Sequence, residues 1–363
     1  MKKIVNKRIL EIKPYVPGKP IEEVQRELGL KDVVKLASNE NPFGPSPQVL
    51  KAISQKAKTI NRYPESSCFY LREELSRQLN VKPNQLIFGN GSDEIIVLAT
   101  RVFTGPGDEV IVARPSFLIY EIAARIAGSK LKFVSLKNFR YDLDAMAKAV
   151  TKKTKIIFIG NPDNPAGTYI TETELKKFLR KIRKNILVFM DEAYFEFAQG
   201  KKGYPDSIKL LESHKNMIVT RTFSKMYGLA GLRVGYGVAD SSVIDIFERV
   251  REPFNVNSLA QAAAVACLQD KRYYQNILKR LENQRRYLYK SFQRLGLHFV
   301  KTATNFVLLD TGQDSLKFSQ SLLRKGIIVR DMGFWGLDTF IRITIGSEKE
   351  NKKLIRALKD LIS

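Results

Sequence analysis

Hydrophobic residues form short continuous runs that alternate with helically spaced stretches, beginning near residue 85. Five runs predict buried strands, at residues 85–88, 109–112, 132–134, 155–159 and 186–190. Three stretches between them place apolar side chains at helical spacing, at residues 93–103, 120–127 and 172–182. Short strands joined by helical crossovers predict an α/β fold, in which helices flank both faces of a mostly parallel sheet.

The pattern changes after Pro253. A long helical region at 259–295 is followed by short strands near 305–309, 326–329 and 340–345 and by a closing helix from Glu348, which predicts a smaller α+β C-terminal domain. The first residues show little periodicity and contain three prolines. We therefore expect an N-terminal arm that packs with the small domain, a large domain and a small domain, at residues 1–35, 36–252 and 253–363.

Composition narrows the class of protein. Of the 363 residues, 44% are hydrophobic and 27% charged, which is typical of a globular chain. No apolar run approaches the roughly 20 residues of a membrane span, and the N-terminus lacks a secretory signal pattern. Two cysteines, Cys68 and Cys267, and two histidines leave little material for a disulfide framework, a metal site or a Ser-His-Asp triad. We expect a cytoplasmic protein without a metal.

The net charge is +24, from 61 basic and 37 acidic residues. Such a charge would attract polyanions, phosphorylated metabolites or an anionic membrane surface. The lysines are scattered, however, and the densest clusters, at 176–184 and 271–286, lie at helical spacing among apolar residues, so we interpret them as solvated helix faces. Because no nucleic-acid-binding motif is present, we expect neither a nucleic-acid nor a membrane partner.

Candidate chemistry follows four of the strands, at residues 89–94, 161–167, 191–194 and 221–225. In an open α/β sheet, ligands bind beyond the carboxyl ends of the strands. Residues 91–94 (Gly-Ser-Asp-Glu) open a helix and can bind an anion, although Ser92 can equally be a plain helix cap. Asp191 directly follows a strand, so it either caps the next segment or faces a ligand.

Lys225 lies in the most distinctive pattern. It follows Thr222 and Ser224 and precedes Gly228, Gly231 and Arg233. A lysine beside hydroxyl groups in a glycine-rich loop can act as an amine nucleophile toward a carbonyl, although a single loop lysine is usually just a surface residue.

Three motifs in this order resemble the aspartate-aminotransferase superfamily of pyridoxal-phosphate enzymes (fold type I). They are Asn-Pro-Asp-Asn-Pro-Ala-Gly at 161–167, Asp-Glu-Ala-Tyr at 191–194, and Ser-Lys through Gly-Leu-Ala-Gly-Leu-Arg at 224–233. Within that superfamily, four more segments resemble histidinol-phosphate aminotransferases: 36–46 (Leu-Ala-Ser-Asn-Glu-Asn-Pro-Phe-Gly-Pro-Ser), 62–64 (Arg-Tyr-Pro), 89–94 and 341–346 (Ile-Arg-Ile-Thr-Ile-Gly). The similarity covers nearly the whole chain.

The resemblance implies that the large domain binds pyridoxal 5′-phosphate, which performs the difficult chemistry. Lys225 would bind the cofactor aldehyde covalently and then move a proton as general base and acid. Asp191 would pair with the pyridine nitrogen, and Tyr194, with Asn164, would donate hydrogen bonds to the ring oxygen. Phe117 would stack on the ring.

The family pattern also assigns the phosphate contacts. Five residues would hold the cofactor phosphate: Ser92, Asp93, Thr222, Ser224 and Arg233. Tyr63 would reach the phosphate of the neighbouring subunit's cofactor, so the resemblance implies a homodimer with two shared active sites. The substrate contacts would be Tyr15, Asn41, Arg330 and Arg342.

The activity that the resemblance implies is transamination in histidine biosynthesis. Histidinol phosphate and 2-oxoglutarate would give imidazole-acetol phosphate and glutamate by a ping-pong mechanism, with the arginines binding either anion in turn. Three alternatives stay open at this point: an aromatic amino acid aminotransferase, a threonine-phosphate decarboxylase, and a non-catalytic nucleic-acid-binding protein that retained the fold.

Overall fold

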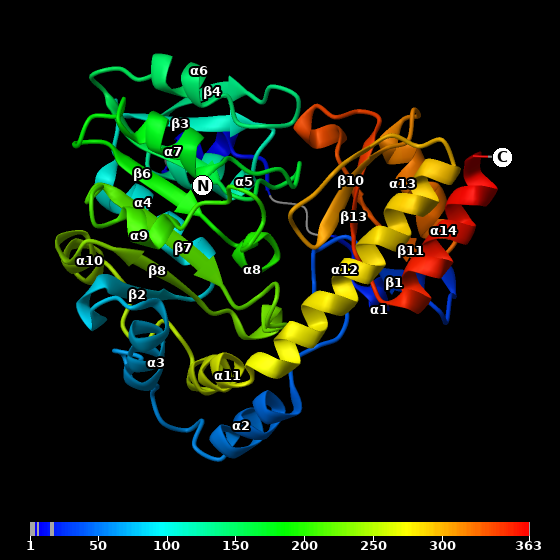
Figure 1. Cartoon of the computed structure of the whole chain (residues 1–363), viewed down its shortest axis with the longest axis horizontal. Coiled ribbons are helices and arrows are strands. Elements are labelled where there is room, and N and C mark those ends of the chain that lie inside the picture. Colours follow the sequence, from blue (N-terminus) through cyan, green and yellow to red (C-terminus); the bar gives the residue numbers. More distant parts are fainter. Residues whose placement is uncertain (1–3, 6, 15–17, 363) are drawn as a thin grey trace. The chain divides into compact units, whose positions relative to one another are not determined.

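The computed structural model describes residues 4, 5, 7–14 and 18–362. The chain divides into two compact units (Figure 1). The first comprises Met1–Pro14, Pro45–Asn164 and Tyr169–Lys271, and the second comprises Tyr15–Gly44, Pro165–Thr168 and Arg272–Ser363.

The first unit is built on a seven-stranded sheet with the strand order β2-β8-β7-β6-β5-β3-β4. The strands are β2 (Leu86–Gly89), β3 (Glu109–Arg114), β4 (Lys130–Ser135), β5 (Thr154–Gly160), β6 (Leu187–Asp191), β7 (Met217–Thr222) and β8 (Gly235–Ala239). Neighbouring strands from β4 to β7 pair in parallel, whereas β8 is antiparallel to both β7 and β2. The predicted α/β fold with a mostly parallel sheet is confirmed.

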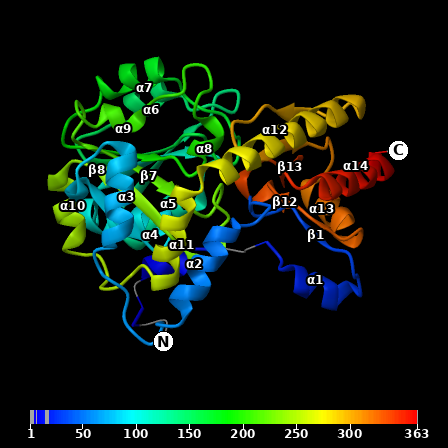
Figure 2. The same cartoon turned by 60° about the horizontal axis from the view of Figure 1, so that its bottom comes forward.

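Helices lie on both faces of this sheet (Figure 2). On one face, α4 (Ser92–Phe103), α5 (Leu118–Ile126) and α10 (Ser241–Glu248) share a core with alternate strand residues, such as Phe158 and Phe189. The unit also contains η1 (Lys7–Glu11), α2 (Pro47–Ala57), α3 (Phe69–Leu79), η2 (Pro83–Gln85), α6 (Leu143–Lys148), α7 (Glu172–Leu179), α8 (Phe195–Ala198), α9 (Ser207–Leu210), η3 (Ala230–Leu232) and α11 (Ser258–Gln269). Because these strands are buried on both faces, their sequences are nearly continuous apolar runs.

The second unit has an antiparallel four-stranded sheet, in the order β12-β13-β10-β9, and a separate parallel pair, β1 with β11. The strands are β1 (Val34–Lys35), β9 (Phe299–Val300), β10 (Phe306–Asp310), β11 (Ile327–Ile328), β12 (Arg330–Asp331) and β13 (Phe340–Thr344). The helices are α1 (Ile21–Leu28), α12 (Lys271–Arg294, all but its first residue in this unit), α13 (Ser315–Arg324), η4 (Gly333–Trp335) and α14 (Glu348–Ile362). This is an α+β unit, as the pattern predicts.

The units do not follow the expected boundaries everywhere. Of the expected N-terminal arm, the described residues up to Pro14 group with the first unit, where η1 contacts α5, whereas residues 18–35 group with the second unit. The first unit also extends to Lys271 rather than to residue 252, because α11 packs against α2 and α3. The expected helical region 259–295 is two helices, since the chain leaves helical geometry at Asp270.

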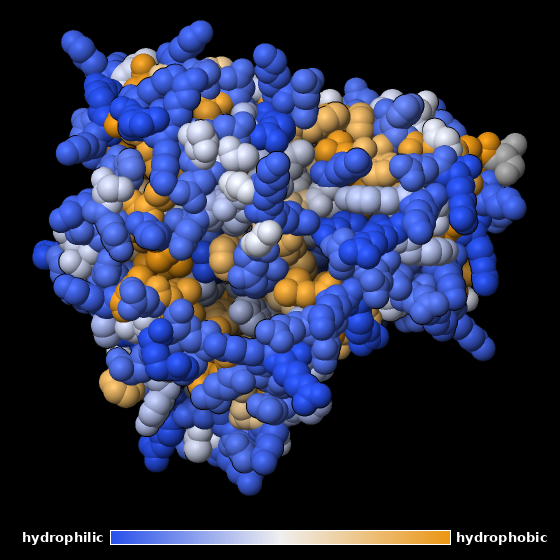
Figure 3. Space-filling model, in the orientation of Figure 1, coloured by the Kyte–Doolittle hydropathy of each residue, from blue (hydrophilic) through white to orange (hydrophobic). Residues whose placement is uncertain are grey.

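The basic clusters lie on exposed helix faces. In α12, buried side chains such as Tyr274, Ile277, Leu281 and Leu288 recur at helical spacing, and most of the lysines and arginines between them are exposed. Figure 3 shows hydrophilic side chains over most of the visible face. Within the described residues, no helix has the length and apolar character needed to cross a membrane.

Candidate active site

The carboxyl ends of three adjacent parallel strands meet at one edge of the large sheet. There β5 ends at Gly160, β6 at Asp191 and β7 at Thr222. Because β8 is antiparallel to both of its neighbours, β2 runs in the same direction as β7 and also ends at this edge. Sequence reasoning therefore predicted correctly that the segments following these four strands begin at one edge.

Asp191 is a buried carboxylate, only 5% exposed. Its Oδ2 accepts a hydrogen bond from the Tyr120 hydroxyl at 2.7 Å, and its Oδ1 accepts one from the Ala193 amide at 3.1 Å. Burial raises the pKa of Asp191 to about 6, although both hydrogen bonds act in the opposite direction. Among the ion pairs of the described residues, none involves Asp191. A buried carboxylate in this state is suited to a cationic ligand group.

The N-terminus of α4 lies against the arginine of the predicted phosphate site. Gly91, with φ of +82°, precedes this helix, and a Cβ there would collide with the Arg233 guanidinium. A Cβ on Gly235 would lie 2.5 Å from the Ser92 amide nitrogen. Both positions therefore require glycine, and the guanidinium lies close to the positive end of a 12-residue helix.

Hydroxyl groups complete this cluster. Arg233 Nη1 donates to Ser224 Oγ at 3.4 Å and to the Ala230 carbonyl at 3.1 Å, and Nη2 lies 3.3 Å from an Asp93 carboxylate oxygen. Thr222 Oγ1 lies 3.1 Å from Ser224 Oγ. The structure thus brings together all five residues predicted to hold a phosphate. A helix N-terminus, two hydroxyls and a guanidinium form an anion-binding arrangement, in which the Asp93 carboxylate balances part of the charge.

The predicted lysine lies near two other predicted residues. Lys225 is half-buried, and its Nζ lies 6.0 Å from the centroid of the Tyr194 ring. The Asn164 amide donates to the Tyr194 hydroxyl at 3.4 Å. Phe117 lies directly before α5 and meets the Tyr120 ring edge-to-face, with centroids 5.6 Å apart.

Tyr63 stands apart from these residues. Its side chain is 84% exposed and its ring stacks on Phe254, with centroids 4.8 Å apart. Within the described residues of this single chain, its contacts do not connect it to the other predicted cofactor-binding residues. Its role therefore stays a prediction that depends on a second subunit.

Sequence reasoning missed the contact of Tyr120 with Asp191, and it missed a buried ion pair on the opposite face of the sheet. Tyr120 follows Phe117 by three residues, a helical spacing that could have revealed it. Glu192 and Arg221 form an ion pair at 2.8 Å, with side chains 0% and 4% exposed. They neighbour Asp191 and Thr222 in the chain, so strand alternation places them on the opposite face, a signal that was available in the sequence.

The predicted substrate residues lie in the second unit. Arg330 and Arg342 are direct cross-strand partners on β12 and β13, which places their side chains on the same face. Arg342 is buried and donates to the Ala37 carbonyl at 2.8 Å, and Arg330 lies 5.0 Å from the Trp335 ring. Asn41 accepts a hydrogen bond from the Phe43 amide at 3.0 Å. Tyr15 lies outside the described residues.

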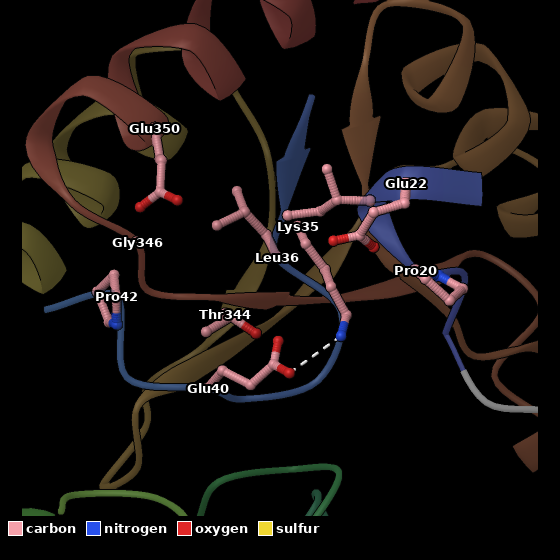
Figure 4. A pocket seen from close by; sticks show the side chains of 10 residues that line it. Pro20, Glu22, Lys35, Leu36, Glu40, Pro42, Thr344, Gly346 and Glu350 are labelled. Atoms are coloured by element: carbon pink, nitrogen blue, oxygen red, sulfur yellow. Dashed lines mark hydrogen bonds and ion pairs between the residues drawn. The ribbon is translucent and has the colours of Figure 1, made fainter. Parts of the chain in front are cut away.

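A cavity of about 300 Å³ also lies within the second unit (Figure 4). Its lining includes Lys35 and Glu40, which form an ion pair at 3.0 Å, and Glu350, which accepts a hydrogen bond from the Ser347 amide. Of the predicted substrate residues that the structure describes, neither Asn41 nor the two arginines line it. Lys35 and Glu40 contact each other, and Glu350 contacts the backbone.

Comparisons with known proteins agree with the motifs. A family model for class I and II aminotransferases matches residues 31–358. The histidinol-phosphate aminotransferase of Moorella thermoacetica is 48% identical over 356 residues, covering 98% of this chain and 92% of that protein. The corresponding protein of Caldicellulosiruptor saccharolyticus is 44% identical over 354 residues, with coverage of 98% and 99%.

A solved structure is also similar to the chain. The crystal structure of histidinol-phosphate aminotransferase from Sinorhizobium meliloti in complex with pyridoxal-5′-phosphate matches with a TM-score of 0.90 and 29% identity. The match covers 98% of this chain and 96% of that one. Sequence and structure comparisons therefore confirm the family resemblance that the motifs indicate.

Proposed function

Since this chain belongs to the class I and II aminotransferase family, we propose that it transfers an amino group from histidinol phosphate to 2-oxoglutarate. The products are imidazole-acetol phosphate and glutamate, a step of histidine biosynthesis. The names of relatives that are 44–48% identical over nearly the whole chain support this substrate. The main structural support for this reaction type is the buried Asp191 carboxylate. It has no ion-pair partner among the described residues, and it lies at the sheet edge where the segment that contains Lys225 begins.

The residues present fit pyridoxal 5′-phosphate. Asp191 supplies a buried negative charge for the pyridine nitrogen, and the cluster of Ser92, Ser224 and Arg233 supplies donors for the phosphate. Lys225 supplies the amine, beside the Tyr194 ring. When bound, this cofactor provides the electron sink that stabilises negative charge at the substrate Cα.

The side chains have separable tasks. Lys225 would hold the cofactor and, once its amine is free, would move the proton from the substrate Cα to the C4′ carbon of the cofactor. Asp191 holds the opposing charge that keeps the ring nitrogen protonated. Tyr194 and Asn164 donate hydrogen bonds to the ring oxygen, Phe117 covers the ring face, and Arg233 binds the phosphate.

For substrate binding, the proposal depends on two arginines of the second unit. Arg330 and Arg342 occupy directly opposite positions on neighbouring strands, so their positively charged side chains lie next to each other on one face of the sheet. Forked guanidinium groups bind either a phosphate or a carboxylate. The pair can therefore serve histidinol phosphate in one half-reaction and the dicarboxylate in the other, with Asn41 and Tyr15 as the further contacts that the family pattern assigns.

We also propose that the enzyme is a cytoplasmic homodimer. Near Tyr63, several large apolar side chains are exposed in the single chain, namely Ile60, Phe69, Tyr70 and Phe254. A second copy covering this area would remove them from water. Tyr63 would then be available to the partner's phosphate site.

The test is an assay of purified protein with 2-oxoglutarate as amino acceptor and three amino compounds offered separately: histidinol phosphate, phenylalanine and threonine phosphate. We expect glutamate to form fastest from histidinol phosphate. Faster turnover of phenylalanine would indicate an aromatic aminotransferase. Carbon dioxide released from threonine phosphate, with no glutamate from histidinol phosphate, would indicate a decarboxylase. Salt-sensitive duplex binding without any turnover would overturn the enzyme proposal altogether.

A further inference from the structure

We propose that Tyr120 is a positioning residue that holds Asp191 and Phe117, which would contact the nitrogen and the face of the cofactor ring respectively, in a fixed relation to each other. The inference rests on the proposed function, because it concerns how the same cofactor is held. Tyr120 touches both residues without itself belonging to the predicted site.

One rigid side chain makes both contacts. Tyr120 lies on α5 and is 1% exposed. Its hydroxyl donates to Asp191 Oδ2 at 2.7 Å, and its ring meets Phe117 at 85° with centroids 5.6 Å apart. A movement of the ring in either direction would therefore disturb the carboxylate and the stacking residue together.

The sheet restrains the Tyr120 ring. It stacks on Phe158 of β5, with centroids 4.7 Å apart and planes at 5°, and Phe158 in turn contacts Phe189 of β6 at 5.0 Å. Phe189 precedes Asp191 by two residues, on the same face of the same strand. With the Ala193 amide on its other oxygen, the carboxylate has one donor at each oxygen, which defines its plane.

The hydroxyl also affects the charge on Asp191. Burial and the nearby Asp191 raise the pKa of Tyr120 well above its usual value, so this hydroxyl stays a donor. Its hydrogen bond lowers the pKa of Asp191, whereas burial, Asp93 and Glu192 raise it. Tyr141 and Asp163 also face the Tyr120 hydroxyl. Removing the hydroxyl should therefore make Asp191 bind a proton at higher pH, and a protonated carboxyl no longer pairs with a cation.

The experiment compares Tyr120→Phe with Tyr141→Phe. Tyr141 is a matched control, because its buried hydroxyl accepts from the Gly160 amide at 2.9 Å and lies near Ser116 rather than bonding to Asp191. Pyridoxal phosphate is titrated into each apoprotein over a series of pH values, and its affinity is followed by absorbance. For Tyr120→Phe we expect a weakening of about tenfold near neutral pH, and an upward shift of the pH at which affinity is half lost.

Two further measurements separate positioning from a general structural effect. In an Asp191→Asn background, Tyr120→Phe is expected to leave the pH profile unchanged, because no titrating carboxylate remains. Should Tyr120→Phe not fold, 3-fluorotyrosine at position 120 keeps nearly the same shape and is a stronger donor, so the profile should shift to lower pH. An unmoved profile in Tyr120→Phe or in the fluorinated protein, or an equal shift in Tyr141→Phe, overturns the inference. Failure of the unmodified protein to bind the cofactor overturns the proposed function instead.

Discussion

Two adjacent acidic residues, Asp191 and Glu192, are both buried, but only Glu192 has a positively charged partner among the described residues. Glu192 faces the side of the sheet where Arg221 pairs with it at 2.8 Å. Asp191 faces the other side, and within the described part of the chain its hydrogen-bond donors are neutral, namely the Tyr120 hydroxyl and the Ala193 amide. Burial raises the pKa of both carboxyls, and for Asp191 the raised value is about 6.

The difference is the reason that we propose Asp191, and not Glu192, as the carboxylate that binds a ligand. A buried charge costs free energy unless a partner compensates it. Arg221 compensates the charge of Glu192 within the chain, so this ion pair connects the ends of β6 and β7 on the face of the sheet opposite Asp191. Among the described residues no cation pairs with Asp191, and we propose that the cofactor's pyridinium would do so. Two consecutive residues would thus have different roles, one in stability and one in binding the cofactor.

The largest effect should come from Asp191→Ala. We expect kcat with histidinol phosphate to fall about 10²–10³-fold, because the charge that stabilises the protonated ring is lost. Cofactor affinity should fall far less, by about the tenfold expected for Tyr120→Phe, since Lys225 and the phosphate cluster remain. Borohydride reduction with pyridoxal phosphate should still label Lys225. Activity within a few fold of the unmodified protein would contradict the role assigned to Asp191.

Glu192→Gln should act on stability. It leaves the Arg221 guanidinium buried without its partner, and we expect the free energy of unfolding to fall by about 4 kcal/mol, measured by urea denaturation. The double variant Glu192→Gln/Arg221→Met removes both charges and should recover part of the loss. A stability loss in Asp191→Ala as large as that in Glu192→Gln would remove the distinction between the two carboxylates.

The smallest effect is a pH dependence of the apoprotein. The pKa of Asp191 is raised from 3.8 to about 6, so the folded chain retains a proton that the unfolded chain releases. Stability should therefore fall as pH rises from about 4 to about 6, by up to about 3 kcal/mol from this group. In Asp191→Asn, the free energy of unfolding should lack this part of its dependence on pH. Urea denaturation at several pH values measures this dependence. Equal slopes in both apoproteins would contradict an uncompensated Asp191.

Much of the first unit was predictable from local pattern. The apolar runs that became β2, β3, β5 and β6 are buried on both faces, so their signal is strong. By contrast, α1 was missed in a segment interpreted as an arm, because Val24 is the only buried residue in that helix and the amphipathic signal is short. The extent of the first unit was missed as well, since α11 belongs there only through its packing on α2 and α3.

The site likewise has residues that the local sequence indicates and contacts that only packing creates. Motifs in the sequence predicted roles for Lys225, Asp191 and Arg233, because each lies at the end of an apolar run or in a glycine-rich loop; these roles stay predictions. It did not identify Tyr120, whose hydroxyl reaches Asp191 across 71 positions of sequence. Nor did it pair Glu192 with Arg221, 29 positions apart.

The order of residues alone determined five of the seven strands of the large sheet, its mostly parallel character and the family, since these depend on local periodicity and on motifs that the chain carries in order. Only the tertiary structure decided which buried charges are compensated. That outcome depends on distances between side chains from different strands and helices, and strand pairing and helix packing set those distances.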